Sequence, residues 1–191
     1  MASFVDDFMK SYGPEVTKHM SSNFNVDPST VKQLIPKLAP LIISGLKKQK
    51  DEQGGDARID HILNKYGDSS VLDNIKDLIA NKAVDSGTDA GLGGLLGSSG
   101  SMAAQVLGKQ HNISAGTIEK MIPALAPLIL GALSRKRDTG GSGISGIGSL
   151  LDMDGDGSIL DDVAGFFTKG AKQRGGGGIL GGLLGGLIRP K

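Results

Sequence analysis

Two stretches of the 191-residue chain decide its fold, because they are copies of one another. Residues 25–51 read NVDPSTVKQLIPKLAPLIISGLKKQKD, and residues 112–138 read NISAGTIEKMIPALAPLILGALSRKRD. They align without a gap at an offset of 87 positions, and 11 of the 27 aligned residues are identical. A repeated segment usually marks two copies of one supersecondary unit, each of which needs the other to bury its apolar face. We expect a pseudo-symmetric pair of units.

Each copy has the apolar periodicity of a helix. In the first copy the apolar residues recur every three or four positions, which places them on one wide stripe; they are Val31, Leu34, Ile35, Leu38, Leu41, Ile42 and Leu46. The prolines at 36 and 40, matched by Pro123 and Pro127, each remove an intrahelical hydrogen bond. The sequence therefore predicts either a bent helix or two short helices with a break between residues 36 and 40.

The rest of the chain also favours helices. Shorter amphipathic segments are expected at residues 2–12, in the stretch 16–24, around Ile59 to Leu63 and from Val71 to Ile79. No useful length alternates with the two-residue period of a strand. The predicted fold class is all-α, with duplicated bent-helix units forming a small helical bundle and a glycine-rich C-terminal tail.

Composition excludes several classes of protein. The chain has no cysteine, so a disulfide scaffold, a thiolate metal site and a cysteine nucleophile are ruled out. Its 21 basic and 20 acidic residues nearly cancel, which argues against a strongly anionic partner. The first 13 residues have no secretory pattern, and no uninterrupted apolar run reaches the roughly 18 residues of a membrane span. We expect a cytoplasmic protein without a transmembrane helix.

Glycine marks the boundaries between units. Residues 139–191 hold 17 of the 31 glycines, and residues 86–101 form a second Gly/Ser-rich stretch. Glycine inside a helix costs about 1 kcal/mol relative to alanine. The predicted organisation is a first helical unit at 1–85, a linker at 86–101, a second helical unit at 102–138 and a glycine-rich tail at 139–191.

The tail contains the one motif with a definite chemistry. Residues 151–163 read LDMDGDGSILDDV, which resembles the start of a calcium-binding loop, with glycine at the sixth position where the chain must turn sharply. The bidentate glutamate of the twelfth position is absent, since Val163 stands there. We predict a calcium site, with a solvated acidic turn as the alternative. Its ligands would come from Asp152, Asp154, Asp156, the carbonyl of Ser158, Asp161 and Asp162.

The two repeats end in basic clusters at equivalent positions. Cations at a helix C-terminus interact favourably with the helix dipole, which is the simpler interpretation. The alternative is a contact surface for an anionic partner such as nucleic acid. The residues concerned are Lys47, Lys48 and Lys50 in the first repeat, and Arg135, Lys136 and Arg137 in the second.

Residues 175–188, GGGGILGGLLGGLI, form a glycine zipper in which glycines recur every four positions. Such spacing lets two helices approach closely, so the segment is predicted to mediate self-association, with a flexible linker as the alternative. The two glycine rows are Gly177, Gly181 and Gly185, and Gly178, Gly182 and Gly186.

The repeated I-P-x-L-A-P-L-I units, together with the aspartate loop, resemble the bacterial family catalogued as domain of unknown function 937. The matching stretches are 34–46, 121–133 and 151–165. The resemblance implies a helical cytoplasmic protein but no activity. No catalytic constellation is found, and a hydrolase using metal-activated water is the least favoured hypothesis. The favoured one is a non-enzymatic, calcium-binding interaction or self-assembly protein, whose partner is a second copy or another protein. A helical nucleic-acid-associated module is the alternative.

Overall fold

The computed structural model describes residues 4–84, 95–96 and 98–139, and all regular secondary structure in these ranges is helical. This confirms the all-α prediction for the described part of the chain. The elements in order are α1 (Phe4–Ser11), α2 (Gly13–Phe24), α3 (Pro28–Gln53), α4 (Gly55–Tyr66), the 3₁₀ helix η1 (Ser69–Leu72), α5 (Ile75–Val84), α7 (Ser98–His111) and α8 (Ala115–Thr139).

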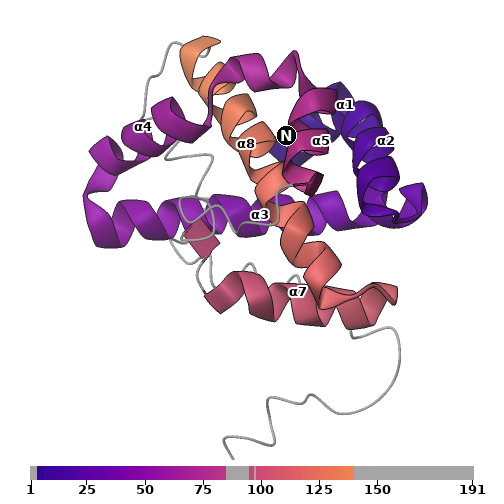
Figure 1. Cartoon of the computed structure of the whole chain (residues 1–191). Helices are drawn as coiled ribbons and strands as arrows, with labels where there is room; N and C mark the ends of the chain where they lie inside the picture. Colours follow the sequence, from indigo (N-terminus) through magenta and orange to yellow (C-terminus); the bar gives the residue numbers. More distant parts are fainter. Residues whose placement is uncertain (1–3, 85–94, 97, 140–191) are drawn as a thin grey trace, which may run out of the picture.

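Helix α8 is the centre of the bundle. It crosses α3 and runs from α7 at one end to α4 at the other, with contacts to α2, α5 and η1 on the way (Figure 1). Every residue from Met121 to Ser134 is buried except Pro123, which is half-buried. A helix that is apolar all round must be covered on all sides, and the surrounding elements do this.

The four prolines lie inside continuous helices. Pro36 and Pro40 are interior residues of α3, and Pro123 and Pro127 are interior residues of α8. The alternative of two short helices with a break is therefore wrong. Within each pair the prolines are four residues apart, so both missing hydrogen bonds fall on one face of the helix. Burial of the apolar stripes outweighs that loss, because each stripe contributes many side chains that become inaccessible to water.

The turns that lead into α3 and α8 have the same geometry. Asn25 and Asn112 are the non-glycine residues with positive φ in the described chain, at 52° and 55°. After each of them a backbone N–H returns to the preceding helix, from Val26 to the carbonyl of Ser21 at 3.2 Å and from Ile113 to that of Gly108 at 2.9 Å. These bonds satisfy carbonyls at the helix end, as left-handed helix caps do.

The next residues begin the long helices with side-chain caps. The carboxylate of Asp27 accepts hydrogen bonds from the backbone N–H groups of Ser29 and Thr30, at 2.9 and 3.2 Å. The hydroxyl oxygen of Ser114 accepts one from the backbone N–H of Thr117 at 3.0 Å. Both caps satisfy donors that the first helical turn leaves unpaired.

Glycines let the chain between α4 and η1 press against α8. A Cβ added at Gly67 would lie 2.9 Å from the backbone carbonyl of Leu130. One added at Gly131 would lie 2.8 Å from Cγ2 of Val71 and 3.0 Å from the carbonyl oxygen of Asp68. Since these separations are too short for real Cβ atoms, both positions need glycine for the present packing.

The predicted linker at 86–101 overlaps ordered structure. Residues 98–101 belong to α7, and Leu95 and Leu96 are buried. Leu95 lies against α3 so closely that a Cβ on Gly45 would be 2.5 Å from its carbonyl oxygen. The end of the predicted linker therefore contributes to the core. The predicted glycine-rich tail at 139–191 lies outside the described residues except for Thr139, which is the last residue of α8.

Among the described residues, α8 is long and apolar enough to cross a membrane by length and composition. The sequence shows no uninterrupted apolar run here, because Pro123, Pro127 and Gly131 interrupt the stretch. In the structure 72% of the apolar window is buried inside the protein, which is how the core helix of a bundle behaves.

The left-handed caps give a stability prediction. Asn112→Ala should lower the free energy of unfolding by about 1 kcal/mol, because alanine tolerates positive φ poorly. Asn112→Gly is the matched control and should retain or exceed the original stability, since glycine adopts this conformation freely. Urea denaturation followed by circular dichroism measures both; an equal loss in the two variants would show that the asparagine side chain matters rather than its backbone angle.

Candidate functional site

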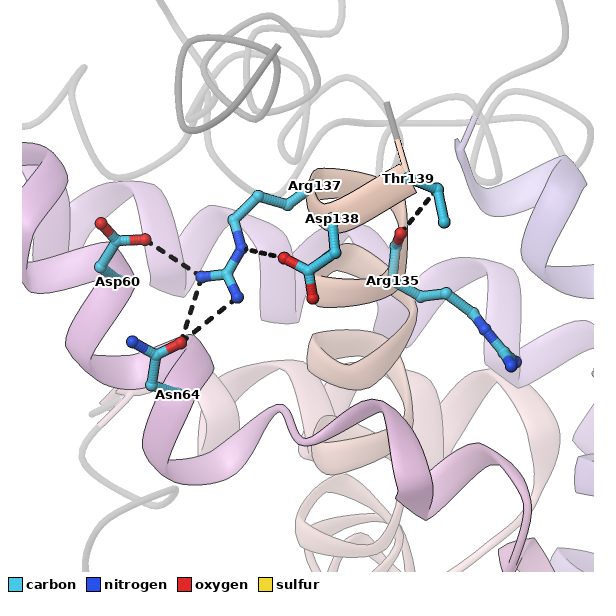
Figure 2. Close-up of polar contacts among 6 residues, drawn as sticks. All are labelled: Asp60, Asn64, Arg135, Arg137, Asp138 and Thr139. Carbon is cyan, nitrogen blue, oxygen red and sulfur yellow. Dashed lines mark hydrogen bonds and ion pairs between the residues drawn. The ribbon is translucent and has the colours of Figure 1, made fainter. Parts of the chain in front are cut away.

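Arg137, from the predicted basic cluster of the second repeat, is held by its own chain. Its side chain is 16% exposed, and its Nη1 atom lies 3.0 Å from Oδ1 of Asp60 and 3.3 Å from Oδ1 of Asn64, both on α4 (Figure 2). Its Nε donates to Asp138 at 2.8 Å. The hydrogen bond to Asp138 and then that to Asp60 raise the pKa of Arg137 above its ordinary value. Arg137 therefore fastens the end of α8 to α4.

The two preceding cations contact the N-terminal helices. Arg135 donates to the hydroxyl of Tyr12, with Nη1 and the oxygen 3.1 Å apart. Lys136 lies 3.5 Å from the carboxylate of Asp7, and its Nζ is 5.9 Å from the ring centroid of Phe4. Both side chains are on the surface, so each contact contributes modestly. Together they connect the end of α8 to α1 and the start of α2.

The basic cluster of the first repeat also lies beside α4. Nζ of Lys50 is 2.7 Å from Oδ1 of Asp56, and the guanidinium of Arg58 donates to Oε1 of Gln49 at 3.1 Å. Lys48 and Glu52 form an exposed pair at 4.0 Å, and Lys47 is half-buried. Helix α4 is thus bound at one end to α3 and further along to α8.

The partners of these cations were not predicted from the sequence. The signal for them is a polar row at four-residue spacing, Asp56, Asp60 and Asn64, which lies on one face of α4. Of the basic residues predicted as a joint contact surface, Lys50 and Arg137 pair with this row, and Lys136 pairs with Asp7 of α1.

A second polar contact connects α3 with α7. Nζ of Lys37 lies 2.9 Å from Nε2 of His111 and 3.3 Å from Oε1 of Gln110, in a partly buried position. Lys37 donates in this contact, so Nε2 of a neutral imidazole accepts. Burial lowers the pKa of Lys37, and burial followed by the charge of Lys37 lowers the pKa of His111.

The described residues contain no group of three or more histidine and acidic side chains that could hold a metal ion. An open depression of about 480 Å³ lies at the turn between α7 and α8, and Lys109 is the ionisable residue among those that line it. One lysine without a neighbouring acid or base does not form a catalytic site. The predicted calcium ligands at 152–162 and the glycine zipper at 175–188 lie outside the described residues.

The described part of the chain is an all-helical protein built around one buried central helix. Its polar contacts hold helices together. The chain belongs to DUF937, a family of bacterial proteins of unknown function, whose model matches residues 6–136 and again residues 136–188. No curated protein and no solved structure matches the chain.

The contacts of Arg137 predict a loss of stability on its removal. Arg137→Ala should lower the free energy of unfolding by about 2 kcal/mol, because it leaves Asp60 without its charged partner in a partly buried site. Lys48→Ala is the matched control, and it should cost less than about 0.5 kcal/mol since that pair is exposed. Urea titration measures both. Equal small effects, combined with weakened DNA binding, would instead favour the nucleic-acid interpretation.

The Lys37–His111 contact predicts that acid destabilises the protein. Because the pKa of His111 is lower in the folded state, the unfolded chain binds more protons as pH falls below about 6.5. The free energy of unfolding should therefore decrease as pH falls from 7.5 to 5. His111→Gln should reduce this pH dependence, as measured by urea titrations across the range; an unchanged slope would show that His111 does not contribute.

Proposed function

We propose that this protein is a non-enzymatic, calcium-binding interaction or self-assembly protein. The observation that carries the proposal is the spacing of Asp152, Asp154 and Asp156, with glycine at the sixth position of the loop. Alternating carboxylates converge on one point only where the chain curls around it, and a hard divalent cation offsets their mutual repulsion. Ser158 would add its carbonyl oxygen, and Asp161 or Asp162 would close the site.

The remainder of the chain supports a binding role over catalysis. Among the described residues, the ionisable side chains discussed above hold α1, α4 and α7 against the long helices. They do not converge on a cleft with a nucleophile and a base. The engagement of Arg135, Lys136 and Arg137 by their own chain also reduces the support for the nucleic-acid alternative.

The architecture of the body is proposed to be a duplication. The pairs α2–α3 and α7–α8 have their left-handed asparagine, their returning hydrogen bond and their side-chain cap at positions 87 residues apart. Two such units would form the bundle, and the glycine zipper at 175–188 would serve self-association in the cytoplasm.

Calorimetry with calcium and then magnesium on the full chain tests the metal site. We expect saturable calcium binding with a dissociation constant of about 10⁻⁴ M or weaker, because the loop lacks the bidentate glutamate. Asp152→Asn/Asp154→Asn should abolish it. Asp68→Asn, which alters an aspartate that caps η1, is the control and should leave it unchanged. Absence of binding to the unaltered protein at millimolar calcium, confirmed by equilibrium dialysis, would reject the calcium site.

A further inference from the structure

A second repeated segment follows each copy of the first one. Residues 67–97, GDSSVLDNIKDLIANKAVDSGTDAGLGGLLG, align without a gap with residues 155–185, GDGSILDDVAGFFTKGAKQRGGGGILGGLLG, at an offset of 88 positions. Thirteen of the 31 aligned residues are identical. At the same offset residues 55–66, which form α4, align with residues 143–154. The duplication thus extends through the aspartate loop and the glycine zipper.

The alignment preserves the core positions. The residues that α4, η1 and α5 bury are each matched by an apolar residue in the second copy. An apolar face repeated within one chain is what two copies of the same elements require. The pairs are Ile59 with Ile147, Ile62 with Leu150, Leu63 with Leu151, Leu72 with Leu160, Ile75 with Val163, and Ile79 with Phe167.

The family match is consistent with this alignment. The family model that matches residues 6–136 matches the chain a second time over residues 136–188. A second match to the same model is expected if the C-terminal part repeats a portion of the N-terminal part.

The structure shows where the first copy of these elements packs. On α8, the residues Pro127, Gly131 and Ser134 form a row along one face, and all three are buried. Gly67, Asp68 and Val71 approach α8 at this row and at Leu130 beside it. Elements of the first unit therefore cover the long helix of the second unit.

The equivalent row on α3 is less covered. Its members Pro40, Ser44 and Lys47, each 87 positions before a member of the row on α8, are half-buried in the described structure. The two units already exchange reciprocal contacts, since α2 contacts α8 and its counterpart α7 contacts α3. Reciprocal packing of this kind assigns the row on α3 to the second copy of α4, η1 and α5.

We propose that residues 143–167 repeat the α4–η1–α5 unit, with the helix equivalent to α4 ending before the aspartate loop that begins at Asp152, and dock on the row Pro40, Ser44 and Lys47 of α3 in the same chain. The occupant is this segment because it begins four residues after the end of α8, so its place in the second unit matches that of α4 in the first. In the first unit α4 likewise follows α3 directly, after Gly54. The docking does not depend on calcium.

The proposal also gives one predicted calcium ligand of the aspartate loop a second role. Asp156 corresponds to Asp68, whose carboxylate accepts a hydrogen bond from the backbone N–H of Ser70 at 2.9 Å, so Asp156 would cap the second 3₁₀ helix. Asp161 corresponds to Asp73. The carboxylates found only in the second copy are those that replace neutral residues of the first: Asp152 for Asn64, Asp154 for Tyr66 and Asp162 for Asn74.

One difference between the two rows limits how closely the second copy can pack on α3. Ser44 stands on α3 where α8 has Gly131, and the packing at Gly131 leaves no room for a Cβ atom. The second copy must therefore sit slightly farther from α3 than the first copy sits from α8.

Disulfide trapping in the full chain tests the docking. The chain has no natural cysteine, so no native thiol can form a competing disulfide. The pair Ser44→Cys/Ile159→Cys corresponds to Gly131 and Val71, which are in direct contact. Under mild oxidation without calcium, we expect an intramolecular disulfide, seen as a shifted monomer on a non-reducing gel and identified by mass spectrometry. Ser22→Cys/Ile159→Cys, with the first cysteine at an exposed site on α2, is the matched control and should react severalfold more slowly.

Amide hydrogen exchange provides a measurement that does not need an engineered disulfide. Leu160→Asp/Val163→Asp should speed exchange in α3 around residues 40–47, whereas Lys169→Asp should not.

Disulfides formed mainly between chains would overturn the proposal in favour of a second copy as occupant. Trapping no faster than the control, with unchanged exchange in α3, would overturn docking altogether. Asp152→Asn/Asp154→Asn should abolish calcium binding but retain the disulfide, so failure of the calcium site and failure of docking are distinguishable.

Discussion

The burial of α8 is the constraint on which the rest of the structure depends. From Met121 to Ser134 this helix has almost no side that tolerates water, so other elements must cover its whole circumference. Covering it requires very close approach at one side, where Gly67 meets the backbone of Leu130 and Gly131 meets Val71. The close packing of large apolar residues from several helices then supplies the main favourable term in folding.

The polar contacts set how the helices are arranged around that core. The row Asp56, Asp60 and Asn64 on α4 takes cations from the ends of α3 and α8, and Arg135 and Lys136 reach toward the first helices. Each pair is individually modest in water, but together they select one orientation of α4 among those that burial alone would allow. Lys50, Arg135, Lys136 and Arg137 thus have partners within the chain.

The two repeated sequence segments differ at positions where the surroundings of α3 and α8 differ. Helix α8 carries Ala124 and Gly131 where α3 carries Lys37 and Ser44. The small apolar residues suit a helix that is covered all round, whereas Lys37 of α3 keeps a polar contact with α7. Within the downstream repeat the divergence is in charge, since the second copy gains carboxylates at Asp152, Asp154 and Asp162. A metal site confined to one copy would add a binding function to a duplicated scaffold without altering its core positions.

The sequence by itself determined the features that depend on nearby residues. The period of the apolar stripes identified helices, the repeat located α3 and α8, and the repeated motifs identified the family, because these signals lie within single segments. The spacing that predicts a calcium loop is equally local. Only the tertiary structure decided that α3 and α8 continue through their prolines, that α8 is central and that Arg137 binds Asp60. These features depend on residues far apart in the chain, whose burial and charge pairing outweigh local preferences.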